Sequence, residues 1–404
     1  MNAETQAKIV SKEVQDFIFA NEGQDEASLL LKHKELFGIS FIPIAQQLVG
    51  RRKAKSKLPT WFQSKGILYP PSINIEQSSS EATAQYKYRI IAEVIKNKNE
   101  VADLTTGFGV DSFFFSKFFK GVHCVEPNGE LLDITKHNYA ILHATNIQYY
   151  QLKAEEFLET TKLKFDLIYV DPSRRDEDNK KLFRLADTTP NVVELQSLFF
   201  EHTDFILIKA SPLLDIQQGL SEIKNVAQVF VVSVGNECKE LLFFATKNYS
   251  LEPTIIAVDL TKSGEVVQQF TFYLSAERAA ASIFSDPLEY LYEPNAAILK
   301  SGAFKLMATN SGVFKIGTNT HFYTSSELVN DFPGRAFKII RINPKAAEWK
   351  NLLPDRKANV VTRNYPMSPD ELKKKLELKD GGEKFVIGCS GEHRKFILLA
   401  TRIK

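Results

Sequence analysis

Residues 101–111 read Val101-Ala-Asp-Leu-Thr-Thr-Gly-Phe-Gly-Val-Asp111, and the stretch Val122-His-Cys-Val-Glu126 follows soon after. The apolar residues 101–104 are typical of a buried strand, and a glycine-containing turn comes directly after them. A phenylalanine-rich helix and a second apolar strand that ends in an acid complete the pattern. This succession is the first strand–loop–helix–strand unit of an open parallel sheet, so it predicts an α/β fold.

The turn after the first strand can bring the backbone close to a ligand. Gly107 and Gly109 have no Cβ atom that would clash with a bound molecule. Glu126 stands at the carboxyl end of the second strand, where its carboxylate can accept two hydrogen bonds from a ribose diol. Together these residues predict a ligand that contains a nucleoside.

The same turn departs from the dinucleotide-binding pattern Gly-x-Gly-x-x-Gly. Ser112 replaces the third glycine, and Asp111 puts a carboxylate where a phosphate would lie. Asp103 adds a further negative charge. Carboxylates repel a pyrophosphate but suit a cationic ligand, such as a sulfonium amino acid with its ammonium group. An ordinary nucleotide-binding fold or a plain tight turn is the alternative interpretation.

On residues 103–109 the chain resembles the class I S-adenosylmethionine-dependent methyltransferases. The run Asp-Leu-Thr-Thr-Gly-Phe-Gly is similar to their first motif, with Thr105 where glycine is commoner. The resemblance implies a Rossmann-like methyltransferase sheet and S-adenosyl-L-methionine as cofactor. The cofactor-binding residues that it implies are Asp103, Thr105, Gly107, Gly109, Asp111, Glu126 and, after the third strand, Ala154 and Glu155.

The composition is that of an ordinary globular protein, with 44% hydrophobic and 25% charged residues among 404. The net charge of +2 does not by itself predict nucleic-acid binding, which would need a local basic patch. The three cysteines lie far apart, so we expect neither a disulfide framework nor a metal site. The sequence shows no signal peptide and no run that could span a bilayer, so we expect a cytoplasmic protein without a membrane partner.

Length and periodicity divide the sequence into three predicted domains. Residues 1–75 show helical periodicity and form an N-terminal helical domain. Residues 76–275 form the Rossmann-like methyltransferase domain. Residues 276–404 alternate short helices and strands, with a helix expected over 293–304, which predicts a small α+β accessory domain that presents substrate. The oligomeric state is left open.

A basic run lies near the end of the helical part. It begins with Arg51, Arg52 and Lys53, and Trp61 and Phe62 follow it. Cations that meet phosphates, next to rings that offer a stacking face, predict a contact with nucleic acid. A solvated helix end is the alternative interpretation.

A second candidate site follows the fourth predicted strand, 165–170. Asp171 and Pro172 come directly after it, at the edge where open α/β sheets bind ligands. Amino methyltransferases, which the chain resembles, have an acid-Pro-Pro-aromatic motif here, and its acid and backbone orient the target amine toward the methyl group. The resemblance therefore implies that Asp171 and Pro172 are the catalytic residues.

The residues after this pair depart from that motif. Ser173 replaces the second proline, Arg174 replaces the aromatic ring, and Arg175 follows. We expect all three to bind substrate, with the arginines on phosphate; ion pairs with the acids at 176–178 are the alternative. Lys209, at the end of the next strand, is a further substrate-binding candidate, although a lysine that leaves a strand end for solvent is commoner.

The absence of cysteine from the loops after Asp171 and Lys209 narrows the chemistry. Methylation at pyrimidine C5 needs a thiolate that adds to the ring. Carbon methylation by that route is therefore disfavoured, and nitrogen or oxygen acceptors are open.

Taken whole, the chain resembles the bacterial class I methyltransferases that carry a C-terminal THUMP-like domain. The stretches that support this are 51–59, 76–83, 103–111, 171–175, 209–212 and 293–297. By analogy with true THUMP domains, the resemblance implies an RNA substrate (tRNA or rRNA), and we expect methylation of a base nitrogen. The rivals are a catalytically inactive RNA-binding protein on a methyltransferase scaffold and a dinucleotide-dependent oxidoreductase, which the missing glycine and Asp111 disfavour.

Overall fold

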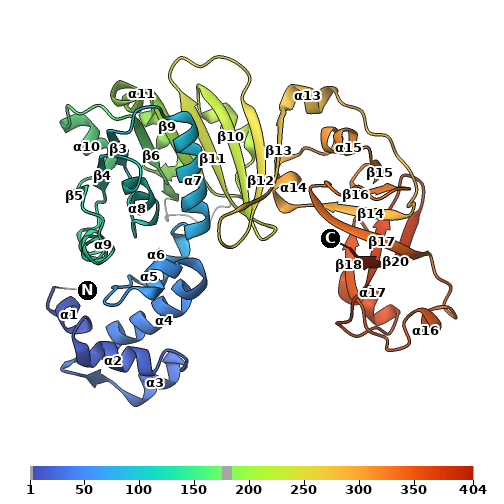
Figure 1. Ribbon diagram of the computed structural model, residues 1–404, viewed down its shortest axis with the longest axis horizontal. Helices are drawn as coiled ribbons and strands as arrows, with labels where there is room; N and C mark the ends of the chain where they lie inside the picture. The colour runs from blue at the N-terminus through green and yellow to red at the C-terminus, as the bar shows by residue number, and fades with distance from the viewer. Residues whose placement is uncertain (1–2, 175–183, 404) are drawn as a thin grey trace. The chain divides into compact units, whose positions relative to one another are not determined.

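The computed structural model describes residues 3–174 and 184–403, which form two compact units (Figure 1). The first unit comprises Met1–Val229, Lys239–Leu251 and Leu260–Glu265, and the second comprises Phe230–Cys238, Glu252–Asp259 and Val266–Lys404. The helical region and the parallel sheet thus belong to one compact unit. The domain boundaries expected at residues 75 and 275 stay predictions.

The N-terminal region of the first unit is helical. Its helices are α1 (Ala3–Ile9), α2 (Lys12–Ala20), α3 (Glu26–Lys32), α4 (Phe41–Lys57), α5 (Pro59–Gln63) and α6 (Ser72–Gln77), with a small ribbon of β1 (Glu35–Leu36) and β2 (Ile39–Ser40) between α3 and α4. Ile44 and Leu48 lie one turn apart on α4 and are almost completely buried. Trp61 of α5 is fully buried, and its ring packs 5.0 Å from the ring of Phe113. The helical region therefore packs on the residues that follow the first strand of the sheet.

The sheet of the first unit is parallel except at one strand. Its strands are β3 (Glu100–Asp103), β4 (Gly121–Val125), β5 (Ile147–Tyr150), β6 (Leu167–Val170), β9 (Phe205–Ala210), β11 (Glu237–Thr246) and the start of β10 (Val226–Val234). They lie in the order β10-β11-β9-β6-β3-β4-β5, and β11 runs antiparallel to β9. The predicted α/β fold with a Rossmann-like sheet is confirmed.

The chain order reverses on either side of β3. Val101 pairs with Val122 of β4 on one side and with Leu167 of β6 on the other, both in parallel register. The carboxyl ends of β3, β4 and β6 therefore meet at one edge of the sheet. Open α/β sheets bind their ligands at such a switch point.

The connections of the sheet are helices with clear starting signals. They are α7 (Glu81–Val94), α8 (Val110–Ser116), α9 (Gly129–Ile141), α10 (Ala154–Thr160), α11 (Val192–His202) and α12 (Ile216–Glu222). Ser80 caps α7, because its hydroxyl accepts the N–H of Thr83. Asn128 caps α9 in the same way through the N–H of Leu131.

The second unit includes a mixed sheet. Its strands are β14 (Tyr290–Pro294), β15 (Phe314–Gly317), β16 (Thr320–Ser325), β17 (Gly334–Ile342), β18 (Asn359–Arg363), β19 (Lys384–Ser390) and β20 (Lys395–Arg402), in the order β15-β16-β14-β17-β20-β19-β18. The helices around it are α14 (Ala296–Ser301), α15 (Lys305–Ser311), α16 (Trp349–Leu352) and α17 (Pro369–Lys375). The unit also holds β12 (Thr254–Leu260, all but its last residue), β13 (Val266–Tyr273) and α13 (Leu274–Ala279).

One predicted element of the second unit is wrong. The sequence predicts a helix over 293–304, but residues 290–294 form β14, between β16 and β17. The helix starts only after Asn295, whose side chain accepts the N–H of Ile298 and so caps α14. Pro294 fits the strand end, where its missing N–H costs little.

We predict that Gly109→Ala destabilises the first unit more than Gly66→Ala does. Both glycines have positive φ, +78° and +80°, so either change costs about 1 kcal/mol of free energy of unfolding. At Gly109 a Cβ would also lie 2.4 Å from the Tyr139 hydroxyl, and such overpacking adds about 1–3 kcal/mol. At Gly66 the nearest atom is at 3.4 Å, an ordinary contact. Urea unfolding of both variants measures the difference, and equal losses would contradict the assigned packing.

Candidate active site at the carboxyl edge of the parallel sheet

The loop between β3 and α8 forms a cradle of backbone atoms. Gly107 and Gly109 adopt φ of +54° and +78°, which only glycine takes readily. The Thr135 hydroxyl donates to the Gly107 carbonyl over 3.0 Å, and the Tyr139 hydroxyl donates to that of Gly109. A Cβ atom built on Gly107 would have the Thr105 carbonyl oxygen, at 3.8 Å, as its one neighbour within 4 Å among the described residues. The space in front of Gly107 is therefore open to a ligand.

Glu126 lies directly beyond β4, beside this loop. One carboxylate oxygen accepts the N–H of Gly107 at 3.0 Å, and the other accepts the N–H of Asn128 at 2.9 Å. Burial raises the pKa of the carboxyl, and these two hydrogen bonds oppose the rise. Each oxygen keeps a second lone pair, so the carboxylate can still accept from a ribose diol. The glycine loop and Glu126 thus fit a nucleoside-containing cofactor.

Asp103 is held inside the protein, and its expected contact with the cofactor stays a prediction. Its side chain is 1% exposed and lies beneath the loop, where it accepts the N–H of Thr105 at 3.0 Å and the hydroxyl of Ser112. Burial raises the pKa of Asp103 to about 7 against the effect of these hydrogen bonds. Asp103 holds the shape of the loop, and Ser112, at the third position of the glycine pattern, is its partner.

Asp111 also has its carboxylate oxygens directed at protein groups, and its expected place in the cofactor site stays a prediction. One oxygen accepts the hydroxyls of Ser79, at 2.7 Å, and Tyr169, at 2.8 Å. The other lies 3.3 Å from the ammonium of Lys87. Burial alone would raise the pKa of Asp111, but Lys87 and then Lys209 hold it below its ordinary value. Asp111 is thus a buried, paired carboxylate.

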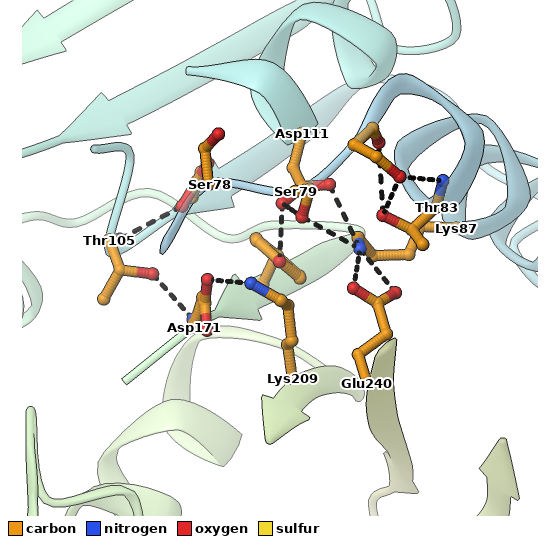
Figure 2. A network of polar contacts seen from close by, with 12 residues as sticks. Ser78, Ser79, Thr83, Lys87, Thr105, Asp111, Asp171, Lys209 and Glu240 are labelled. Carbon is orange, nitrogen blue, oxygen red and sulfur yellow. Dashed lines mark hydrogen bonds and ion pairs between the residues drawn. The ribbon is translucent and has the colours of Figure 1, made fainter. Parts of the chain in front are cut away.

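Lys87 is the centre of this network, as Figure 2 shows. Its side chain has no solvent exposure, and its ammonium lies 2.6 Å and 2.9 Å from the two oxygens of Glu240 on β11. It also donates to the Ser79 hydroxyl at 3.2 Å. A buried cation is tolerated only with such a full set of partners. The network joins α7, the start of α8 and β11 at the edge of the sheet.

Asp171 lies at the end of β6 on the same edge. Its backbone N–H donates to the Thr105 hydroxyl at 2.7 Å, so the loops after β3 and β6 are joined. Its Oδ2 pairs with the ammonium of Lys209, from β9 (Figure 2). The side chain is 29% exposed, and among the described side chains, which exclude those of residues 174–183, no donor lies at hydrogen-bond distance from Oδ1. One carboxylate oxygen is therefore available to a substrate.

Lys209 stays a fixed cation beside Asp171. Burial would lower the pKa of its ammonium, but the carboxylates of Asp171, Glu240 and Asp111 raise the pKa above its ordinary range. The side chain is only 12% exposed, so the interpretation as a lysine that leaves the strand for solvent is wrong. Lys209 cannot act as a base at neutral pH; it holds and orients Asp171.

The remaining candidates near Asp171 are placed as follows. Pro172 is half-buried, and Ser173 is exposed and donates to the Thr189 carbonyl at 3.3 Å. Arg174 belongs by its backbone to β7 (Ser173–Arg174), which pairs with β8 (Thr188–Thr189). Arg175 lies outside the described residues. Ala154 and Glu155 form the start of α10, after the carboxyl end of β5.

The basic run at 51–53 makes ion pairs within the helical region. Arg51 pairs with Glu22 at 3.0 Å, Arg52 with Glu26, and Lys53 with Glu76. The substrate-binding prediction is wrong for Arg51, since its guanidinium is buried and lies 4.4 Å and 4.6 Å from the ring centroids of Phe19 and Phe62. The stacking face expected at Trp61 is absent because that ring is fully buried.

Four members of the network were not predicted as site residues: Ser79, Lys87, Tyr169 and Glu240. The sequence pattern could have indicated Lys87, because this residue falls on the apolar stripe of α7 beside Ile90 and Ile91. Glu240 stands directly before the buried residues of β11. A charged residue on a buried stripe indicates a paired charge. Within the described residues, no cluster fit to hold a metal and no helix able to cross a membrane is present.

The chain is similar to a known structure over its whole length and to known domain families over its C-terminal part. Family models match residues 290–333, as a ferredoxin-like domain, and residues 334–402, as a THUMP domain-like region. The crystal structure of a "putative methyltransferase" from Porphyromonas gingivalis W83 aligns over 100% of both chains, with a TM-score of 0.85 and 29% identity. The chain carries a methyltransferase fold with a THUMP-like C-terminal region. The resemblance stated from the sequence is confirmed.

A curated relative adds a shorter match. An uncharacterized RNA methyltransferase of Mycoplasma mobile is 26% identical over 121 residues, which are 30% of this chain and 33% of that protein. The chain thus matches about a third of the length of this methyltransferase.

We predict that Lys87→Met lowers the free energy of unfolding of this methyltransferase fold by about 3–5 kcal/mol, because it leaves Asp111 and Glu240 buried without their cation. Arg89→Met on the same helix is the control. Arg89 pairs with Glu265 at the surface, where such a pair contributes about 1 kcal/mol or less. Urea unfolding measures both, and a similar small loss in both would contradict a buried network.

We predict that Asp103→Asn flattens the pH dependence of stability between about pH 4 and pH 7. The folded chain keeps a proton on Asp103, with its pKa of about 7, that the unfolded chain releases near pH 4. This group therefore makes the wild type lose stability as the pH rises through that window. The slopes of the two melting-temperature curves should differ between about pH 4 and pH 7, where only the wild type loses stability through this group, and should agree outside that window. Parallel curves throughout would contradict the raised pKa.

Proposed function

We propose that the protein transfers a methyl group from S-adenosyl-L-methionine to a base nitrogen of RNA. The observation that carries this proposal is the position of Asp171, beside the cradle of Gly107 and Glu126, with one carboxylate oxygen open. S-adenosyl-L-methionine supplies an activated methyl group when it is bound. The chain then has to bind, align and deprotonate an acceptor.

Asp171 is suited to align an amine. Its open oxygen can accept a hydrogen bond from an N–H of the acceptor, which directs the nitrogen lone pair away from the carboxylate. Gly107 and Glu126 would hold the cofactor, which would supply the methyl group to that nitrogen. The proton that the nitrogen then releases can pass to Oδ1 of Asp171. Lys209, fixed on Oδ2, keeps the carboxylate in this orientation.

Thr105 has a role that its place in the first motif does not reveal. Glycine is commoner at this position in the resembled family, but here the hydroxyl accepts the N–H of Asp171 at 2.7 Å. The cofactor loop is therefore hydrogen-bonded to the backbone of Asp171, whose carboxylate would meet the acceptor.

Two of the three cysteines do not favour methylation at pyrimidine C5, and the third, Cys238, is half-buried in β11. Cys124 and Cys389 are buried in β4 and β19, and burial raises the pKa of each thiol to about 12. Neither is an activated thiolate that could add to a pyrimidine ring. This supports a nitrogen acceptor over pyrimidine C5.

RNA as the substrate class has two lines of support. The curated relative is named an RNA methyltransferase. In this chain, residues 334–402, which match the THUMP-like model, contain 16 Lys and Arg but only 8 Asp and Glu. The whole chain has a net charge of +2, so positive charge is concentrated in this region. Such an asymmetry is typical of proteins that bind nucleic acid.

We predict that Asp171→Asn lowers the rate of methyl transfer by about 100-fold or more and leaves the affinity for S-adenosylhomocysteine within about twofold, because it removes the proton acceptor and not the cofactor cradle. Asp204→Asn is the control: Asp204 lies just before β9, at its amino end, and its side chain is 72% exposed. Calorimetry gives the affinity.

Mass spectrometry of tRNA and rRNA nucleosides from a strain that lacks the gene gives the activity. One modified nucleoside should be missing, and the wild type and Asp204→Asn should restore it where Asp171→Asn does not. A full set of nucleosides in that strain, with RNA binding intact, would favour the catalytically inactive RNA-binding protein instead.

A further inference from the structure

Lys209 has hydrogen-bonding capacity that its pairing with Asp171 does not use. An ammonium carries three N–H groups, and one of them donates to Oδ2 of Asp171. Asp171 is the one hydrogen-bond or ion-pair partner of Lys209 among the described side chains, which exclude those of residues 174–183. The Lys209 side chain keeps 12% of its surface exposed. Two N–H groups are therefore left for a bound molecule.

The nearby carboxylates do not take these two N–H groups. Both oxygens of Glu240 are paired with the Lys87 ammonium, at 2.6 Å and 2.9 Å. Asp111 has one oxygen 3.3 Å from Lys87, and its other oxygen accepts two hydroxyls. From beyond ion-pair distance the charges of Glu240 and Asp111 raise the pKa of Lys209. The charges at this edge of the sheet are therefore balanced, and Lys209 is a permanent hydrogen-bond donor.

Lys209 and Asp171 have fixed positions at the carboxyl edge of the sheet. They stand one residue beyond Val170 of β6 and Ile208 of β9, which lie side by side in parallel register. On the other side of β6, the Thr105 hydroxyl accepts the backbone N–H of Asp171 at 2.7 Å. A base brought to this edge (Figure 2) meets two groups together: Oδ1 of Asp171, which accepts, and an N–H of Lys209, which donates.

The charge of Lys209 distinguishes between two kinds of base nitrogen. Asp171 can accept an N–H from either kind. An exocyclic amine becomes positively charged as it takes a methyl group, which an adjacent ammonium opposes. A lactam N–H, as at N1 of guanine or N3 of uracil, becomes nucleophilic by losing its proton, and the neighbouring carbonyl oxygen shares the negative charge. An ammonium that donates to that oxygen stabilises the developing charge, so the pair favours a lactam.

We propose that Asp171 and Lys209 together select a lactam nitrogen of the RNA base, with Lys209 donating to the carbonyl oxygen beside the nitrogen that is methylated. The inference rests on the proposed function and narrows its acceptor to this class of nitrogen. The proton of the ring N–H passes to Oδ1 of Asp171, and the electron pair of that bond stays on the base. The nitrogen then takes the methyl group that the cofactor would supply, and the charges of the base and of the sulfonium cancel. Asp171 afterwards releases its proton to water.

The nucleoside that disappears from a strain without the gene tests the acceptor class. Loss of N1-methylguanosine or N3-methyluridine, resolved by chromatography and mass spectrometry, is the expected result, and it also identifies the base. Loss of a nucleoside methylated on an exocyclic amine would overturn the inference and leave the proposed function standing. A full set of nucleosides would overturn both.

Lys209→Met tests the role of Lys209, with the purified full chain and RNA from that strain as substrate. We expect kcat to fall by about 100-fold, with a smaller change in KM. The rate should rise with pH more steeply than that of the wild type, because a lactam that loses its proton to alkaline solution depends less on the ammonium. Lys209→Arg, which keeps a cationic donor, should retain most of the activity. Lys247→Met is the matched control, since Lys247 lies 4.0 Å from Asp204 at the opposite edge of the sheet.

Melting temperature and affinity for S-adenosylhomocysteine separate this role from a purely structural one. Both should stay close to the wild-type values in Lys209→Met, because Asp171 keeps its contact with solvent and the cofactor cradle is unchanged. Wild-type activity in Lys209→Met, or a loss of kcat that is equal at every pH, would overturn the role of Lys209. The nucleoside analysis needs no variant, so it decides the acceptor class even if Lys209→Met does not fold.

Discussion

The carboxyl edge of the sheet depends on one buried ammonium group, that of Lys87. A cation without solvent contact is costly unless carboxylates and hydroxyls surround it. Its partners, Asp111 and Glu240, come from the start of α8 and from β11, and Tyr169 and Ser79 share the oxygen of Asp111 that Lys87 leaves. All these elements have to reach their native positions before the charges are balanced. The same constraint fixes the neighbourhood of Lys209 and Asp171.

The parallel sheet could be predicted from the sequence because strands buried on both faces need continuous apolar residues. The runs at 101–104 and 165–170 are continuous apolar segments of this kind. They form β3 and β6, with ends shifted by one or two residues. The error at β14 has a physical reason. Residues 296–301 do form a helix, but the capping side chain of Asn295 starts it after Pro294, and pairing with β16 and β17 makes a strand of the residues before it.

The site was predictable where function depends on the ends of strands. Gly107, Glu126 and Asp171 follow directly from that rule. The partners of charged residues were not predictable, because a pairing across many positions leaves no local pattern. Arg51 meets Glu22 in a contact that only the folded helices create, and Asp103 accepts the hydroxyl of Ser112 inside the protein. The sequence shows where the charged residues of a site lie along the chain. The tertiary structure decides which of them pair with one another inside the protein.

Phe108 stands between the two glycines of the cofactor loop, yet its side chain is 3% exposed. Its ring lies 6.3 Å from that of Trp61 and 6.4 Å from that of Tyr69, both from the N-terminal helical region. The Phe108 side chain of the cofactor loop therefore packs on residues far upstream of the sheet. A variant shortened to the parallel sheet would lose this packing. A chimera with a different N-terminal region would have to keep Trp61 and Tyr69 together with the loop.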